Sequence, residues 1–283
     1  MVRVLLFMAR AAAFSRGRTA LAVVGLLALA AAPVSLAVVP RASDYHSLLV
    51  LRSDPNTLLL GTHQGLYRSS DGGHTWHAAG LPGEDVMNLV QAGGTILMGG
   101  HNVFAASTDG GKSWQAAKPS GLPSLDVHGL AVDPRNPKTV YAQVAMTGLY
   151  RSTDGGRSFS LFSSDVNGMM MQVAVTPAGS LVVGDMSRGI FLSSTGKHWL
   201  NTAHGAVLGV AVDPSNPKRI VATGGGIAVS DDGGHTWKAA LASKVAFGAI
   251  AWSPQNPKLV YAVSYDRGLW RSLDSGEHWK RFA

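Results

Sequence analysis

One octapeptide recurs along this chain at nearly even intervals. Its first copy reads Ser69-Ser70-Asp71-Gly72-Gly73-His74-Thr75-Trp76, and four more copies keep the aspartate, while a shortened copy at 193–199 has threonine in its place. From each copy's aspartate, or the threonine that replaces it, to that of the next copy the distance along the chain is 38, 45, 41, 37 and 42 residues. A repeat of about forty residues is typical of propellers and other modular folds, and it predicts six units over residues 44–283. The repeated positions are Asp71, Asp109, Asp154, Thr195, Asp232 and Asp274.

Each unit reads as four short strands. In the third unit an apolar run at 127–132 ends in the turn Asp133-Pro134, because proline cannot donate to a strand ladder. Strands at 139–142 and 148–152 follow, and the octapeptide leads into the fourth strand. This pattern predicts an all-β fold, a six-bladed β-propeller of four-stranded antiparallel blades. The expected blades are 44–83, 84–122, 123–163, 164–203, 204–243 and 244–283.

We expect every blade to be built from consecutive strands. The first begins near Asp44 and the last ends at the C-terminus, so no segment before Asp44 is expected to complete the sixth blade. Ring closure should then rest on packing between the first and the last blade.

The repeated turn resembles the Asp box, or BNR repeat, of sialidases and many other β-propellers. In that family the box is a hairpin turn whose carboxylate caps backbone amides and whose aromatic ring packs between blades. The resemblance covers nearly all of residues 44–283. The chain is also similar to exported bacterial propellers described as glycosylhydrolase-like and to photosystem II assembly factors, although the latter usually have seven blades. The resemblance implies structural roles for the box residues Asp71, Asp109, Asp154, Asp232 and Asp274.

The N-terminal segment differs from the repeats in its charge. Five of the 24 Lys and Arg residues precede Asp44, where there is no acidic residue, and residues 19–40 carry no charge. A basic start, an apolar stretch and small residues around Ser35-Leu36-Ala37 are typical of an export signal, and the stretch is also long enough for an anchor. We expect residues 1–43 to form a signal peptide or an N-terminal membrane-anchor helix, with the propeller extracytoplasmic, either periplasmic, secreted or anchored.

The remaining charge excludes several classes of function. From Asp44 onward there are 19 basic and 17 acidic residues, which leaves only +2 and favours no nucleic-acid partner. Membrane contact is expected only through the N-terminal segment. The chain has no cysteine, so disulfides, thiolate metal sites and a cysteine nucleophile are excluded.

The acidic residues outside the boxes and proline turns fall on one face of the predicted propeller, opposite the boxes. Aligned by repeat, the first four units begin with aspartate, whereas the fifth and sixth have Ala206 and Val245. Carboxylates and histidines are therefore expected on one side of the tunnel mouth, with an apolar wall opposite. The candidate ligand-binding residues are Asp44, His46, His63, Asp85, His101, Asp126, His128, Asp165, Arg188 and Arg267.

Three interpretations of this mouth stay open. In the first, the aspartates only cap backbone amides and no cofactor is bound. Imidazole and carboxylate together also suit a divalent metal, for which His46 and His128 are the candidates, and the thioethers of Met169, Met170 and Met171 would suit copper. The third alternative is a protein, small-molecule or glycan ligand.

For function, we favour a non-catalytic binding or scaffold module that uses the tunnel-mouth face. The alternative is a glycoside hydrolase acting on extracytoplasmic glycans, which needs paired carboxyl groups; Asp126, Asp165 and Asp266 are its candidates. Sialidase chemistry fits poorly, because the chain has only two glutamates, Glu84 and Glu277, and the second lies inside a box. The sequence leaves open whether the protein is an enzyme and leans toward the non-catalytic reading.

Overall fold

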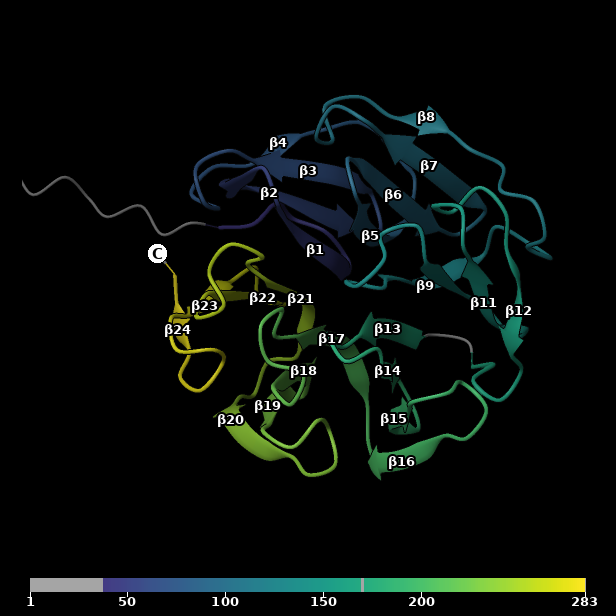
Figure 1. Cartoon of the computed structure of the whole chain (residues 1–283). Helices are drawn as coiled ribbons and strands as arrows, with labels where there is room; N and C mark the ends of the chain where they lie inside the picture. Colours follow the sequence, from purple (N-terminus) through teal and green to yellow (C-terminus); the bar gives the residue numbers. More distant parts are fainter. Residues whose placement is uncertain (1–37, 169–170, 283) are drawn as a thin grey trace, which may run out of the picture. The chain divides into compact units, whose positions relative to one another are not determined.

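A computed structural model describes residues 38–168 and 171–282, which form six four-stranded sheets arranged as blades around a central axis (Figure 1). Blades one to three comprise β1 (Tyr45–Leu51), β2 (Asp54–Thr62), β3 (Gly65–Ser69), β4 (His77–Ala78); β5 (Val86–Ala92), β6 (Thr95–Gly100), β7 (Val103–Ser107), β8 (Gln115–Ala116); and β9 (Val127–Val132), β10 (Val140–Val144), β11 (Gly148–Ser152), β12 (Ser160–Ser163). Blades four to six comprise β13 (Met171–Val175), β14 (Leu181–Asp185), β15 (Gly189–Ser193), β16 (Leu200–Ala203); β17 (Val207–Val212), β18 (Ile220–Gly224), β19 (Gly226–Ser230), β20 (Lys238–Ala242); and β21 (Phe247–Trp252), β22 (Val260–Ser264), β23 (Leu269–Ser272), β24 (Lys280–Arg281).

The predicted six-bladed, four-stranded architecture is confirmed. Each sheet pairs its strands antiparallel and in chain order, so every blade is built from consecutive strands. The predicted signal or anchor helix falls on residues 1–37, which lie outside the described residues. Within the described ranges, no helix is long and apolar enough to cross a membrane.

The hydrophobic core lies between neighbouring blades. All five residues of β10 are buried, as are all five of β22, because both faces of these middle strands pack against adjacent sheets. Such strands are mostly apolar and show no regular alternation of apolar and polar residues, although each of the two contains one buried polar residue, Gln143 and Ser264. Six clusters of buried side chains result, and one of them joins blades one and six through Leu48, Leu60 and Val263.

The two faces of the propeller carry different turns. In four blades a backbone bond ties the box to the first turn of the same blade; for example, Gly155 N–H donates to the Lys138 carbonyl and Gly233 N–H to the Lys218 carbonyl, both at 2.8 Å. We call this side the box face. The turns between the second and third strands and the links between blades lie on the opposite side, the mouth face.

The box aspartates bind their own turns. Asp109 Oδ1 accepts hydrogen bonds from the N–H groups of Lys112 and Ser113 at 3.0 and 2.9 Å and from the Ser107 hydroxyl at 2.8 Å. The hydrogen bonds from Ser113, from its hydroxyl and its backbone N–H, and that from Ser107 hold the pKa of this carboxyl well below its usual range. Gly111 follows with φ of 81°, and a Cβ there would overlap the side chain of Leu59 in the preceding blade. The box thus turns the chain and packs it between blades.

The segment before β1 takes part in ring closure. Val38 forms an antiparallel bridge with Gly268 in blade six, and Val39 is fully buried in the cluster that joins blades one and six. Arg267 Nε donates to the Val39 carbonyl at 3.1 Å, and the Tyr45 hydroxyl donates to the Pro40 carbonyl at 2.7 Å. Packing between the end blades closes the ring as predicted, and the sixth blade takes its four strands from β21–β24 with no strand from before Asp44. Residues 38–40 nevertheless add an isolated bridge and buried contacts to this closure, which the sequence interpretation did not include.

Candidate functional site

A β-bulge near the start of several inner strands aims side chains into the tunnel. In β1, β5, β9 and β17 the pairing register shifts by one residue, at His46, Met87, His128 and Leu208 respectively. A bulge leaves the extra residue out of the ladder and redirects its side chain. All four side chains line the cavity at the tunnel mouth, together with Gln172 of β13.

Histidines and aspartates of the first three blades meet on one side of this mouth. His46 and His128 lie on inner strands, Asp85 directly precedes β5, and His63 and His101 lie in the turns between second and third strands. We call the following set the mouth cluster: His46, His63, Asp85, His101, Asp126 and His128.

Local turn chemistry holds the two loop histidines. The Thr62 hydroxyl accepts a bond from Gln64 N–H at 3.2 Å and donates to the Gly65 carbonyl at 2.9 Å, which fixes the turn that carries His63. The turn with His101 continues into Asn102, whose φ of 58° lies in the left-handed region that asparagine tolerates.

Asp85 is the centre of the mouth cluster. Its side chain is only 9% exposed, and three imidazole nitrogens surround it: His46 Nε2 at 3.3 Å, His63 Nδ1 at 3.0 Å and His101 Nδ1 at 2.7 Å. Burial alone would raise the pKa of this carboxyl, but the hydrogen bond and charge of His46 and the charges of His63 and His101 outweigh burial and lower it. The carboxylate therefore stays ionised although it is buried.

Asp126 joins the other two rings of the cluster. Its Oδ1 lies 2.8 Å from His128 Nε2 and 3.6 Å from His101 Nε2. A backbone bridge between Gly100 and Asp126 brings the second and third blades together at this point. The rings of His101 and His128 meet edge to face with centroids 4.8 Å apart. His101 therefore contacts both carboxylates, one with each ring nitrogen.

The opposite wall of the mouth is largely apolar. Val207, Leu208 and Met186 line it, and Tyr265 closes the side toward blade six. Burial, followed by the neighbouring carboxylate of Asp44, raises the pKa of Tyr265 to about 12. The cavity between these walls has a volume of about 50 Å³, which is room for a few water molecules or an ion.

The alignment of inner strands is wrong for two blades. In blade four, β13 begins six residues after Asp165, which is an exposed bend residue beyond β12. Three inner strands, not four, are therefore directly preceded by aspartate. In blade six, Ala246 rather than Val245 directly precedes β21.

The sequence contains a signal that would have corrected this alignment. Asp126 lies eight residues before Pro134, the proline of the first turn in its blade. The same count from Pro177 of blade four ends at Met169, not at Asp165. Met169 and Met170 lie outside the described residues, and the side chain of Met171 is not described either, so the thioether part of the metal prediction stays a prediction.

The remaining candidates serve other contacts. Arg188 Nε donates to Asp185 at 2.9 Å, and Asp185 also accepts the N–H groups of Ser187 and Arg188. Arg267 holds the Val39 segment, and Asp266 is paired with Arg281 at 2.8 Å.

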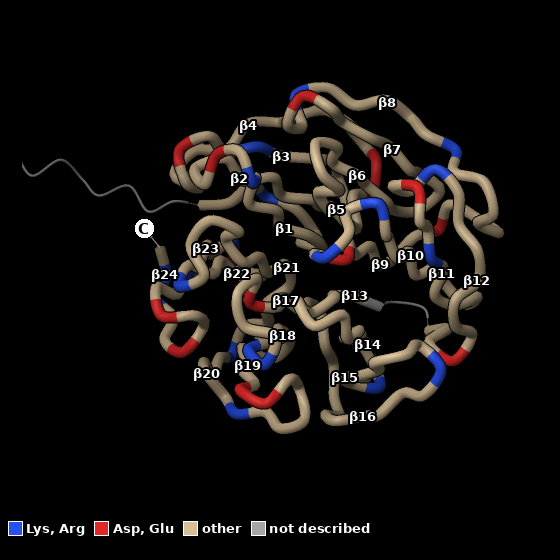
Figure 2. Tube along the Cα trace, viewed as in Figure 1, with Lys and Arg blue, Asp and Glu red and all other residues tan. Residues whose placement is uncertain are grey.

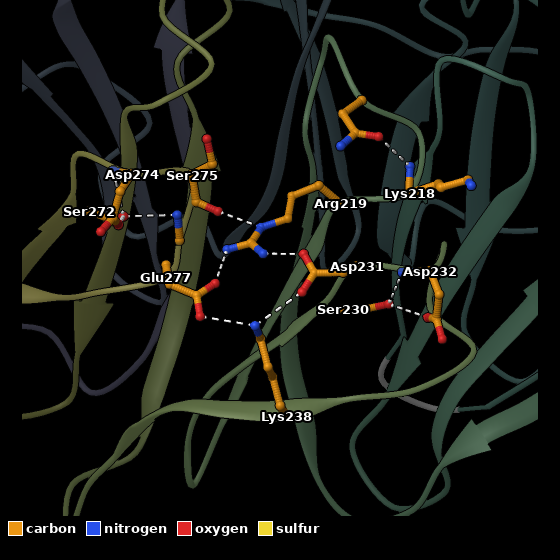
Figure 3. A network of polar contacts seen from close by, with 12 residues as sticks. Lys218, Arg219, Ser230, Asp231, Asp232, Lys238, Ser272, Asp274, Ser275 and Glu277 are labelled. Atoms are coloured by element: carbon orange, nitrogen blue, oxygen red, sulfur yellow. Dashed lines mark hydrogen bonds and ion pairs between the residues drawn. The ribbon is translucent and has the colours of Figure 1, made fainter.

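A second charged cluster, on the box face, was missed by the sequence interpretation. Arg219 is bonded to Asp231 of the fifth box, to Glu277 of the sixth at 2.8 Å and to the Ser275 carbonyl at 2.8 Å (Figure 3). Lys238 Nζ contacts the same two carboxylates at 3.1 and 2.9 Å. Arg219, Asp231, Lys238 and Glu277 form what we call the blade-five/six network. In the sequence, this network is indicated by Asp231 and Glu277, the acidic residues at variable positions of the fifth and sixth boxes.

Charges on the propeller are mixed in sign. Figure 2 shows basic and acidic segments interspersed around the ring, which agrees with the small excess of +2 counted from Asp44 onward. The feature that sets the mouth apart is its concentration of histidine rather than a field of one sign.

The fold and mouth define a six-bladed Asp-box propeller with a polar site on the face opposite its boxes. The sequence model of one family, described as photosynthesis system II assembly factor YCF48, matches residues 41–283. Because the match spans most of the chain, this protein belongs to that family.

Solved structures share the fold at low sequence identity. YCF48 from Cyanidioschyzon merolae is 19% identical with a TM-score of 0.59, and the match covers 87% of each chain. YCF48 bound to a D1 peptide is 20% identical with a TM-score of 0.56, covering 87% of this chain and 83% of that one. The GH74 xyloglucanase from Xanthomonas campestris is 18% identical with a TM-score of 0.62, covering 88% of this chain but 46% of the enzyme. A search of curated proteins found no match.

Proposed function

We propose that this protein is a non-catalytic binding module that holds a peptide segment of a partner protein on the mouth face. The observation that carries the proposal is its membership of the YCF48 family, in which one solved relative is bound to a D1 peptide. The leader of residues 1–43, with its arginines and uncharged stretch, supports an extracytoplasmic place of action. The partner class is therefore an exported or membrane protein with an accessible segment.

The chemistry of the mouth suits a peptide. Peptide-binding surfaces combine apolar contacts with a few polar groups that fix orientation. Here exposed Met186 and the neighbouring Leu208 offer apolar contacts, and the half-exposed imidazoles of His63 and His101 offer hydrogen bonds. A peptide would lie across this face, because the cavity of about 50 Å³ is too small to take more than a side chain or a few waters.

A glycoside hydrolase is less well supported. Its three candidate carboxylates are Asp126, which is engaged with histidines, Asp266, which is paired with Arg281, and Asp165, which is exposed beyond β12. None of the three is among the described residues that line the mouth cavity. The GH74 similarity supports the fold alone.

Site-specific crosslinking tests the proposal. A photoreactive residue replaces either Met186 on the mouth face or Leu273 on the box face, which are 41% and 59% exposed. In the native envelope, the full chain should form crosslinks to a peptide segment of a defined partner from position 186 and not from the matched control at 273. Equal crosslinking from both positions would contradict a mouth-face site. Turnover of a panel of glycans by the purified chain would favour the hydrolase instead.

A further inference from the structure

We propose that the mouth cluster binds one divalent transition-metal ion through His46, His63, His101 and Asp85. Three imidazoles and one carboxylate form a nitrogen and oxygen ligand set that suits zinc, nickel or copper(II). The site does not depend on the peptide-binding proposal, because its ligands and its test involve the metal alone.

The spacing of three of the four ligand groups, those of His46, His63 and Asp85, fits a single ion. Four ligands at the usual 2.0–2.2 Å from a tetrahedral zinc ion lie about 3.3–3.6 Å from one another. His46 Nε2 and His63 Nδ1 are 3.5 Å apart, and the same atoms lie 3.3 and 3.0 Å from the Asp85 carboxylate. His101 Nδ1 is 2.7 Å from the same carboxylate, so His101 would become the fourth ligand by turning its ring toward the ion.

The second observation is the state of the Asp85 carboxylate. Both of its oxygens are buried, and among the described residues no backbone amide or hydroxyl donates to them. The box carboxylate of Asp109, by contrast, is bonded by backbone amides and hydroxyls of its own turn. A buried carboxylate needs a cation or several donors. A metal ion held by the imidazoles would supply that cation.

The surroundings of the ligands complete the geometry of a metal site. Metal-bound histidines usually direct their second ring nitrogen at a carboxylate, which fixes the tautomer and the ring orientation. His101 does so: its Nε2 faces Asp126 at 3.6 Å, and Asp126 in turn contacts His128 at 2.8 Å. The side chains of His63 and His101 are 49% and 43% exposed, so an ion can enter from solvent without unfolding of the blade.

Titration of the full chain, purified without an affinity tag, tests the site. Calorimetry with Zn²⁺ should give one ion per chain, and Co²⁺ should produce the visible absorption bands of tetrahedral nitrogen and oxygen coordination. Asp126→Asn should weaken binding by about 10–100-fold, and His63→Gln and His101→Gln should each weaken it more. The matched control His235→Gln removes an exposed histidine of the box face and should leave binding unchanged.

Several results would overturn the assignment. Absence of binding heat, equal loss from H235Q and H63Q, or an octahedral Co²⁺ spectrum would each exclude this ligand set. Two ions per chain would place a second ion on Asp126 and His128 and contradict the single site. Since Asp85→Asn changes a buried group and with it the stability of the fold, the two exposed loop histidines carry the test, and circular dichroism of each variant checks its fold.

Discussion

The mouth cluster and the blade-five/six network are both built from charged side chains, yet they differ in how their charges are compensated. The network contains two permanent cations and two carboxylates, and each carboxylate contacts both Arg219 and Lys238 (Figure 3). Its carboxylates have lowered pKa values, because hydrogen bonds from Arg219 and Lys238 favour their charged form. The charges of the network therefore compensate one another at any pH near neutrality.

The charges of the mouth cluster are not compensated in the same way. Among the described residues, its two carboxylates form ion pairs with four imidazoles and with no Lys or Arg side chain. A network whose permanent charges balance one another stabilises the fold. A cluster that lacks a permanent cation can bind a metal ion from solvent. The comparison shows that the number of charged residues in a cluster does not identify a binding site in this propeller. The type of basic residue, histidine rather than lysine or arginine, does.

The largest expected effect concerns the mouth cluster. A ligand at 100 times its dissociation constant stabilises a folded protein by about 2.7 kcal/mol, or roughly 5–10 °C in Tm for a domain of this size. Saturating Zn²⁺ should therefore raise the Tm of the wild type and of Arg219→Leu alike, measured by scanning calorimetry. Loss of the zinc effect in R219L, or its persistence in H63Q together with H101Q, would break the distinction between the two regions.

Next in size is the loss of Arg219 itself. Its side chain is only 10% exposed, and its removal leaves Asp231 and Glu277 with Lys238 alone and the Ser275 carbonyl without its donor. Because both carboxylates retain access to water, we expect Arg219→Leu to cost about 2 kcal/mol in the free energy of unfolding, less than a fully buried pair. Urea unfolding measures the change. A cost equal to that of Lys238→Leu would show that burial of the guanidinium does not matter.

A smaller effect is expected at Asp85, with a distinct dependence on pH. The folded-state pKa of this carboxyl is lowered, so its ionised form stabilises the fold at pH values above the unfolded pKa near 3.9. The contribution is lost as pH falls through the folded pKa. Without metal, Asp85→Asn should cost about 1 kcal/mol at pH 6, and the gap between the unfolding curves of wild type and variant should shrink below pH 4. A gap that widens on acidification would contradict the sign of the shift.

Much of the fold could be predicted from the sequence because its determinants are local. The box at Asp109 closes its turn with groups from residues 107–113, so the octapeptide alone specifies the hairpin. Six such turns at blade spacing then specify the ring. The contribution of Val39 could not be predicted in this way, because it rests on a contact with residues more than 200 positions away.

The candidate site was predictable in part for the same reason. The aspartate before an inner strand and the histidine of a neighbouring turn occupy equivalent places in successive blades, so His63, Asp85 and His101 could be grouped before their distances were known. Asp165 was grouped with them because the longer link of blade four shifts the strand. The bulges that aim His46 and His128 inward leave no simple mark in the sequence, since they depend on pairing with the second strand.

The smallest effect is expected for Lys238, and it tests whether the network acts through burial or through the number of ion pairs. Lys238 contacts the same two carboxylates as Arg219, at 3.1 and 2.9 Å, but its side chain is 53% exposed. Solvent screens such pairs, and the flexible lysine loses entropy when it is held. Lys238→Leu should therefore change Tm by about 1 °C or less, and 0.5 M NaCl should remove most of that difference. If the change in Tm of Lys238→Leu instead matched that of R219L and persisted in salt, the number of ion pairs, not burial, would decide stability in this network. The contacts of Asp85 with its three imidazoles would then also have to be judged by their number.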